Sequence, residues 1–422
     1  MAFQPLGASD KSAVAKADHR VIQAQLAALG SRGVPPWLRS ENAQQDGSIP
    51  RRATDFANVT NEDLIEILAI RGPLHALDGW SYVGRALNAL IAGDSHAAKH
   101  LAYYGELRGA LSLLASSGIG IFNSQNVCID QNSNVLSMSS RGTHDMCWPT
   151  IVEWAQRSGS VDRLISPVML AGSSMLGAFR EFFPGETSSV AAYLMKEWGF
   201  DLQQGADDQA ERNRSSYQPT ALLPQRTSPA DDTRFLRMFW ESLRPGAVGL
   251  ERHLFRILLE EESRSNGEAV PDFSSRHPRL DEGLQTVVSL PFLAREDEPY
   301  DHPFLCHAAK KISPAHPYSM LCRAALLLKF ATGMAEANLQ AAGIRPTQHF
   351  ESWWHGFGIE HGLWSPQAEP ALPEELWGDI DVALEDIEAA PTEHRHGWTL
   401  ALGGSAFRVC ETERAALWGL FR

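Results

Sequence analysis

Apolar residues recur at helical spacing through most of the chain. Thr60 is a residue type that caps helices, and the apolar positions after it share one helical face: Leu64, Ile65, Ile67 and Leu68. A similar face follows Thr233: Phe235, Leu236, Phe239, Trp240 and Leu243. Alternation with a period of two is limited to Asn126–Met138 and Trp398–Cys410. The pattern predicts a mainly α protein of two helical-bundle blocks, with at most a short β-hairpin in each.

The segment His96–Ser117 is predicted to be one long helix that packs closely against another. An apolar stripe lies beside a stripe of small residues, which lets a second helix approach: Ala98, Ala102, Gly105, Gly109 and Ser112. A polar row recurs every four residues along the same helix: His96, His100, Tyr104 and Arg108. Because a cation at the edge of a buried stripe is costly without a partner, we expect Arg108 to be paired.

Changes in composition divide the chain into four parts. Residues 1–58 hold one predicted helix, around Lys16–Leu29, and a stretch rich in Gly, Pro and Ser, which indicates a loosely attached N-terminal arm. Residues 59–200 form the first helical block. Residues 201–232 are polar and lack periodicity, as expected of a linker or mobile loop. Residues 233–422 form the second helical block.

Charge and cysteine content limit the classes of partner and the compartment. The 37 Lys and Arg against 51 Asp and Glu give a net charge of −14, which opposes a general attraction to nucleic acids or anionic membranes. No apolar run is long enough to span a membrane, and no signal peptide is visible at Met1. The 5 cysteines include no Cys-x-x-Cys pair. We therefore expect a cytoplasmic protein with reduced thiols and no membrane partner.

An aromatic segment in the second block is the candidate for a ligand pocket or partner interface. It combines rings, imidazoles and one acid at Trp353, Trp354, His355, Glu360 and His361. Packing within the core is the alternative use of these rings. A cluster of possible zinc ligands, His302, Cys306, His307 and His316, shows neither the usual four-ligand set nor a second pair nearby, so we expect neither a metal nor a cofactor. Motifs for nucleotide hydrolysis, dinucleotide binding and serine hydrolysis are absent.

The run His100–Ile119 resembles the core helix of HEPN-like domains. In that family an aromatic pair, here Tyr103 and Tyr104, precedes a Leu/Ala-rich helix that ends at a glycine, here Gly118. The resemblance covers this short part of the chain. It implies a helical bundle that often dimerises, and a bacterial protein of an antiphage or toxin-type system. Some members of the family are metal-independent RNases, and others bind partner proteins.

The nuclease motif of that family is missing from this sequence. Nuclease members carry an arginine followed by a histidine after four to six residues, whereas Arg71 and His75 or Arg345 and His349 leave only three residues between them. A pair distant in sequence, Arg108 with His144, could replace the motif if the fold brought the two side chains together. In that case Arg108 would stabilise the phosphate charge and His144 would transfer a proton.

Three functions follow from these patterns, and the sequence leaves open whether the protein is an enzyme. The first is a bacterial, cytoplasmic, macromolecule-binding protein of an antiphage or toxin-type system, with a protein partner or a second copy of itself. His100 and Tyr104 are its candidate binding residues, together with the aromatic segment. The second is a metal-independent RNase that uses Arg108 and His144, with RNA as partner. The third is a small-ligand sensor whose pocket is the aromatic segment.

Overall fold

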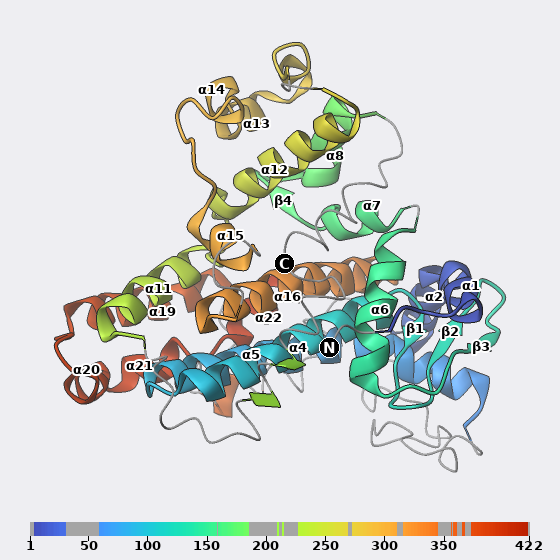
Figure 1. The fold of residues 1–422 in the computed structure, drawn as a ribbon, viewed down its shortest axis with the longest axis horizontal. Coiled ribbons are helices and arrows are strands. Elements are labelled where there is room, and N and C mark those ends of the chain that lie inside the picture. Colours follow the sequence, from blue (N-terminus) through green and yellow to red (C-terminus); the bar gives the residue numbers. More distant parts are fainter. Residues whose placement is uncertain are drawn as a thin grey trace.

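The protein is mainly α-helical, in agreement with the prediction (Figure 1). The computed structural model describes residues 4–30, 59–157, 159–184, 227–268, 272–309, 315–344 and 373–420, with short pieces between 209 and 214 and between 356 and 367. Three long helices form its central layer: α4 (Asn61–Ile91), α5 (Ser95–Ala115) and α16 (Pro317–Ala341). The predicted start of α4 is confirmed by a capping box. Thr60 Oγ1 accepts from Asp63 N at 3.0 Å, and Asp63 Oδ2 accepts from Thr60 N at 3.1 Å.

The small residues of α5 let α16 approach closely, as the sequence predicts. A Cβ atom on Gly109 would lie 3.0 Å from Leu327 Cγ, and one on Gly105 would lie 3.3 Å from Ala324 Cβ. The same interface buries an ion pair between Arg323 Nε and Glu106 Oε1, at 3.2 Å. Glycine therefore fixes the distance between the two helices at positions where alanine would already be crowded.

The N-terminal segment is firmly packed, so the expectation of a loosely attached arm is wrong for residues 4–30. It forms two helices, α1 (Ala8–Lys16) and α2 (His19–Gly30), instead of one. Val14, Ile22 and Leu26 are almost completely buried, because they face α4, α16 and the small sheet. The carboxylate of Asp10 also accepts bonds from Ser139 N at 2.8 Å and Ser139 Oγ at 2.6 Å. These long-range contacts cannot be inferred from the local composition.

The first predicted hairpin is confirmed within a three-stranded antiparallel sheet. Its strands are β1 (Ile119–Gly120), β2 (Val127–Ile129) and β3 (Val135–Ser137). Val127 pairs with Ser137 and Ile129 pairs with Val135, so the turn lies at residues 130–134. Helices α6 (Thr143–Ala155) and α7 (Ser160–Ile165) follow, then a two-stranded ribbon of β4 (Met169–Leu170) and β5 (Ser173–Ser174), and α8 (Met175–Phe182).

The second predicted hairpin, over Trp398–Cys410, is wrong. This segment is helical in α20 (Arg395–Leu402) and α21 (Gly404–Arg408). Trp398 and Leu402 are both buried and lie four residues apart, on one face of α20 that turns towards the core. A short stretch in which apolar and polar residues alternate can also satisfy a helical period, and tertiary packing selected the helix here.

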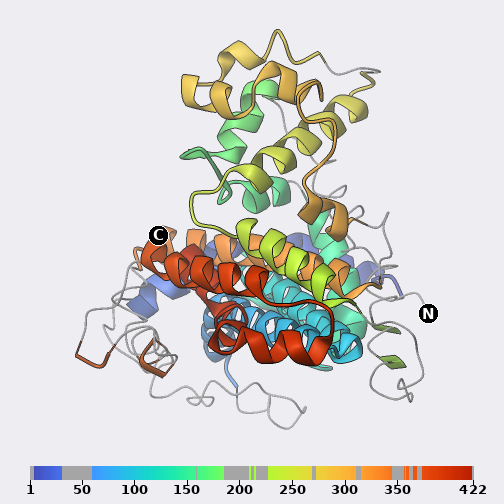
Figure 2. The same ribbon diagram turned by 90° about the vertical axis from the view of Figure 1, so that its left-hand side faces the viewer.

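The remaining helices form an upper lobe and one end of the bundle (Figure 2). The upper lobe contains α8 together with α12 (Gly249–Ser265), η1 (His277–Arg279), α13 (Glu282–Val287) and α14 (Leu290–Leu293). Helix α15 (Pro303–Ala308) follows the lobe and packs on α16 of the central layer. The end of the bundle contains α11 (Pro229–Glu241), α19 (Pro373–Ala389), α20 and α21, whereas α22 (Glu413–Leu420) packs on α16 and α4.

Helices from both predicted blocks share one hydrophobic core. From the second block, α16 packs on α4 and α5, and α22 packs on α4. The contact is polar as well as apolar, since Trp80 Nε1 donates to Thr332 Oγ1 at 3.0 Å. Most of the predicted linker 201–232 lies outside the described residues, and its end already belongs to α11, which begins at Pro229. Its role as a boundary stays a prediction.

Candidate functional site

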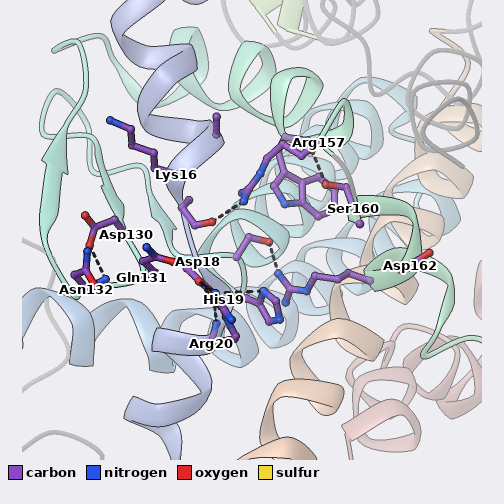
Figure 3. Close-up of a pocket in the computed structure, with 16 residues that line it drawn as sticks. Lys16, Asp18, His19, Arg20, Asp130, Gln131, Asn132, Arg157, Ser160 and Asp162 are labelled. Carbon is purple, nitrogen blue, oxygen red and sulfur yellow. Dashed lines mark hydrogen bonds and ion pairs between the residues drawn. The ribbon is translucent and has the colours of Figure 1, made fainter. Parts of the chain in front are cut away.

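A cavity of about 860 Å³ lies where the N-terminal segment meets the small sheet and the end of α6 (Figure 3). Residues 15–20, from the end of α1 to the start of α2, line it. The β2–β3 turn, with Asp130, Gln131 and Asn132, lies on one side, and the connection from α6 to α7, with Arg157 and Ser160, lies on the other. Its volume is in the range of roughly 300–1,000 Å³ that is usual for small-molecule sites.

Arg157, just after α6, holds the N-terminal segment with one of its nitrogens. Its Nη2 donates to Ala17 O at 2.6 Å. Its Nε and Nη1 make no hydrogen bond within the described part of the chain. Burial lowers the pKa of Arg157, so its positive charge is incompletely solvated. The guanidinium therefore keeps donors for a further partner at the cavity wall.

Arg163, on α7, connects the cavity to the central layer. Its Nη2 donates to Ser116 O at 3.0 Å and to Asn338 Oδ1 at 3.3 Å, and its Nη1 donates to Ser117 Oγ at 3.1 Å. Burial, together with the nearby charge of Arg157, lowers the pKa of Arg163 to about 10. These contacts place a cation at the C-terminal end of α5, where the helix dipole favours it. All three acceptors are neutral, and Asp18 offsets the charge of Arg163 only from beyond ion-pair distance.

The acidic residues of the cavity wall are engaged elsewhere. Asp18 binds Arg20, with both carboxylate oxygens 3.0 Å from Arg20 Nε, and the hydrogen bond lowers the pKa of Asp18 to about 2. Asp162 pairs with Arg180 at 2.6 Å. Among the described residues, no carboxylate lies within ion-pair distance of Arg157 or Arg163. The cavity therefore carries an excess of positive charge.

Asp130 orders the turn on the opposite wall. Its Oδ1 accepts from Asn132 N at 2.8 Å and from Asn134 N at 2.9 Å. The side-chain amide of Asn134, which donates to Asp130 Oδ2 at 3.0 Å, and these backbone bonds lower the pKa of Asp130 and keep its charge within the turn. The side chains of Gln131 and Asn132 stay exposed at the cavity rim.

The positive charges around the cavity affect the protonation of His19. Burial lowers its pKa to about 4, and the charges of Arg163, Arg20 and Arg157 act in the same direction, against the opposing effect of Asp18. Its Nδ1 lies 3.8 Å from Asp18 Oδ1. His19 is therefore neutral at pH 7, and an anion in the cavity would favour its protonation.

The chemistry of the cavity suits binding an oxyanion. Guanidinium groups with unused N–H donors recognise carboxylates, phosphates and sulfates through charge-assisted hydrogen bonds. The hydroxyl group of Ser160 donates to Trp154 O at 2.6 Å, and its side chain has no base beside it among the described residues. The arrangement therefore offers recognition and charge neutralisation, and no nucleophile–base pair.

The RNase pair predicted from the sequence is not assembled in the described part of the chain. Arg108 Nε pairs with Asp78 Oδ2 at 2.7 Å, and its Nη1 lies 3.3 Å from His75 Nδ1. His144 Nδ1 instead hydrogen-bonds Tyr103 Oη at 2.7 Å. Tyr103 and Arg108 are five residues apart, so their side chains leave α5 in different directions. The expectation that Arg108 has a defined partner is confirmed, and its ion pair with Asp78 connects α5 to α4.

The other predicted site residues lie away from the cavity or outside the described residues. His100 and Tyr104 meet edge to face at 5.2 Å, and Tyr104 stacks on Tyr82 at 5.3 Å. Glu360 is exposed. Most of the aromatic segment lies outside the described residues: Trp353, Trp354, His355 and His361.

The described residues include no group of three or more His, Cys, Asp or Glu side chains that could hold a metal ion. His302 caps α15 by accepting from Phe304 N at 3.3 Å. Cys306 Sγ donates to Asp301 O at 3.5 Å. Both of these residues, from the cluster considered for zinc, therefore have structural roles.

Sequence reasoning missed Arg157 and Arg163. The signal was the run Arg157-Ser-Gly-Ser-Val-Asp-Arg163, in which two arginines flank a Gly–Ser turn at the end of a helix. Gly159 adopts a φ of 79°, which a glycine tolerates readily. The excess of positive charge depends on the distance in space between the acidic residues and the two arginines, and a sequence pattern does not predict this distance.

No family model, curated protein or solved structure matches this chain. None of the described helices is long and apolar enough to cross a membrane. The resemblance of α5 to the HEPN core helix stays a prediction.

Proposed function

We propose that this protein binds a small anionic ligand in the cavity formed by Arg157, Arg163 and residues 15–20. One observation supports the proposal most strongly: in the described part of the chain, two neighbouring, partly buried guanidinium groups have no carboxylate within ion-pair distance, and the nearby Asp18 is bound to Arg20. Like charges in a poorly solvated place raise the free energy of the folded protein. An oxyanion would neutralise both charges and use the free donors of Arg157.

A purely structural role explains only part of this arrangement. Arg163 stabilises the last turn of α5, and Arg157 donates a hydrogen bond to one carbonyl of the N-terminal segment, that of Ala17. Neither contact requires the two cations to be neighbours beside an open cavity. The proposal keeps the ligand-binding function expected from the sequence and assigns it to this cavity. Binding of a macromolecular partner in an antiphage or toxin-type system stays a separate prediction.

The first prediction tests Arg157 by calorimetric titration with pyrophosphate in the presence of EDTA. We expect the native protein to bind pyrophosphate, and Arg157→Gln to weaken binding by about 10- to 100-fold, because a charge-assisted hydrogen bond contributes about 1.5–3 kcal/mol. Arg234→Gln is the matched control. It removes the same charge from a side chain that is 75% exposed and pairs with Asp231.

Two results would contradict the proposal. One is that the native protein fails to bind pyrophosphate, phosphate or sulfate at millimolar concentration. The other is that Arg157→Gln and Arg234→Gln reduce affinity equally, since the effect would then come from net charge. Circular dichroism and a melting curve of each variant show whether the fold has survived.

A further inference from the structure

The carboxylates on the cavity wall leave two positive charges without a close counter-ion. In the described part of the chain, Asp18 and Asp162 are each ion-paired with an arginine outside the proposed site. The third wall carboxylate, Asp130, is held within its own turn and is attracted to Lys16. The charges that remain are those of the two arginines of the proposed site, one positive charge each.

The N–H groups that these two arginines leave unused are accessible. Arg157 donates through Nη2 alone, and Arg163 donates through Nη1 and Nη2. Within the described residues, Nε and Nη1 of Arg157 and Nε of Arg163 therefore make no hydrogen bond. None of these three nitrogens is a buried atom, so a ligand in the cavity can reach them.

Three accessible donors and two charges match the chemistry of a phosphate monoester. Its phosphate group presents three terminal oxygens and carries a charge of about −1.5 to −2 at pH 7. A sulfate ester also presents three terminal oxygens, but it carries a single charge. A carboxylate has one charge and only two oxygens. Of these three groups, the phosphate monoester alone neutralises both arginines.

We infer that the anionic group recognised in the cavity is a dianionic phosphoryl group, held between Arg157 and Arg163. This inference rests on the proposed function and names the class of ligand. Charge-assisted hydrogen bonds from guanidinium to phosphate oxygens are short and strong. Inorganic phosphate and the phosphate monoesters of organic molecules share this group, and a cavity of about 860 Å³ has room for either.

The wild-type protein gives the first test, by calorimetric titration with methyl phosphate and methyl sulfate at pH 7.5, constant ionic strength and in EDTA. The two ligands have the same shape and differ in charge. We expect methyl phosphate to bind at least about tenfold more tightly, because its second charge strengthens the bonds to both arginines. Equal affinities would overturn this inference and leave the proposed function standing. Failure of both ligands to bind would overturn both.

Two substitutions of Arg157 separate the effect of charge from that of structure. Arg157→Gln removes the charge, whereas Arg157→Lys keeps it. We expect the ratio of methyl phosphate affinity to methyl sulfate affinity to fall about tenfold in Arg157→Gln and to stay close to the native ratio in Arg157→Lys. Arg234→Gln, at an exposed position, is the matched control and should keep the native ratio.

An unchanged ratio in Arg157→Gln would show that the selectivity comes from another group, and the inference would be wrong. The comparison in the wild-type protein tests the inference even if a variant does not fold. Titration with inorganic phosphate and with glucose 6-phosphate then distinguishes the two sources of the phosphoryl group, since the tighter ligand identifies the source. Weaker binding of both than of methyl sulfate would overturn the inference.

Discussion

Two arginines at the edge of the cavity, Arg157 and Arg163, hydrogen-bond to other parts of the chain and still present positive charge to the cavity. Arg163 binds the end of α5 and Asn338 of α16, while Arg157 binds the carbonyl of Ala17. Asp18, which could neutralise them, is held by Arg20. The positive potential therefore results from how partners are distributed among neighbouring residues.

A prediction at this scale concerns the pH dependence of anion binding through His19. The pKa of His19 is about 4 in the folded protein, and a bound anion raises it. Binding is then coupled to proton uptake, so affinity increases as pH falls towards 4, by about tenfold per pH unit at most. We expect sulfate, which does not itself titrate in this range, to bind more tightly at pH 5 than at pH 7.5.

His19→Asn is the control, and its sulfate affinity should change little over the same range. A pH dependence that persists in this variant would assign the effect to another group.

The stability of the protein without ligand depends on pH in the opposite direction: it decreases as pH falls. The unfolded chain, with a pKa near 6.5, takes up the proton first, so the contribution of His19 to stability declines as pH falls from about 6.5 to about 4.

At the scale of helices, glycines decide which surfaces can meet. Gly84 on α4 faces the segment between α21 and α22. A Cβ atom there would lie 2.1 Å from the carbonyl oxygen of Cys410 and 3.0 Å from Thr412 Oγ1. Because the nearest atom belongs to the backbone, a change of rotamer cannot relieve the contact. Thr412 also donates a hydrogen bond to Trp80 O on α4, which fixes this approach.

We therefore predict that Gly84→Ala destabilises the protein by about 2–3 kcal/mol, measured by urea unfolding. Gly177→Ala in α8 is the matched control, since nothing lies within 4 Å of its added Cβ. That change should stabilise the protein by about 0.5–1 kcal/mol, the usual gain over glycine in a helix. Equal effects of the two substitutions would mean that α4 and residues 410–412 do not pack as described.

At the scale of the whole molecule, the order of segments along the chain does not match their order in space. The N-terminal helix α2 packs on α16, which lies more than 280 residues later in sequence, and Gln23 Nε2 donates to Asn338 Oδ1 at 3.1 Å. The buried Arg323–Glu106 pair also joins the two predicted blocks. Separating such a pair leaves an uncompensated buried charge, which costs about 3–5 kcal/mol.

This arrangement predicts that neither block folds independently. Expressed separately, residues 1–200 and 201–422 should be poorly soluble or melt without cooperativity, because α5 and α16 would each expose the face that the other covers. Expressed together, they should co-purify and melt cooperatively. The interpretation fails if either fragment alone is monomeric and melts as sharply as the intact protein.

The sequence alone determined what depends on local pattern. The helical class, the capped start at Thr60, the small-residue face of α5, the hairpin after Asn126 and the need of Arg108 for a partner all follow from spacing within a few turns. The packing of residues 4–30 and the helices over Trp398–Cys410 were missed, because burial against distant helices overrode the local composition and alternation. The cationic cavity was also decided only by tertiary structure. Arg157 and Arg163 carry excess charge because folding brings them together and engages Asp18 and Asp162 with other arginines, and Coulomb energies depend on distances in space.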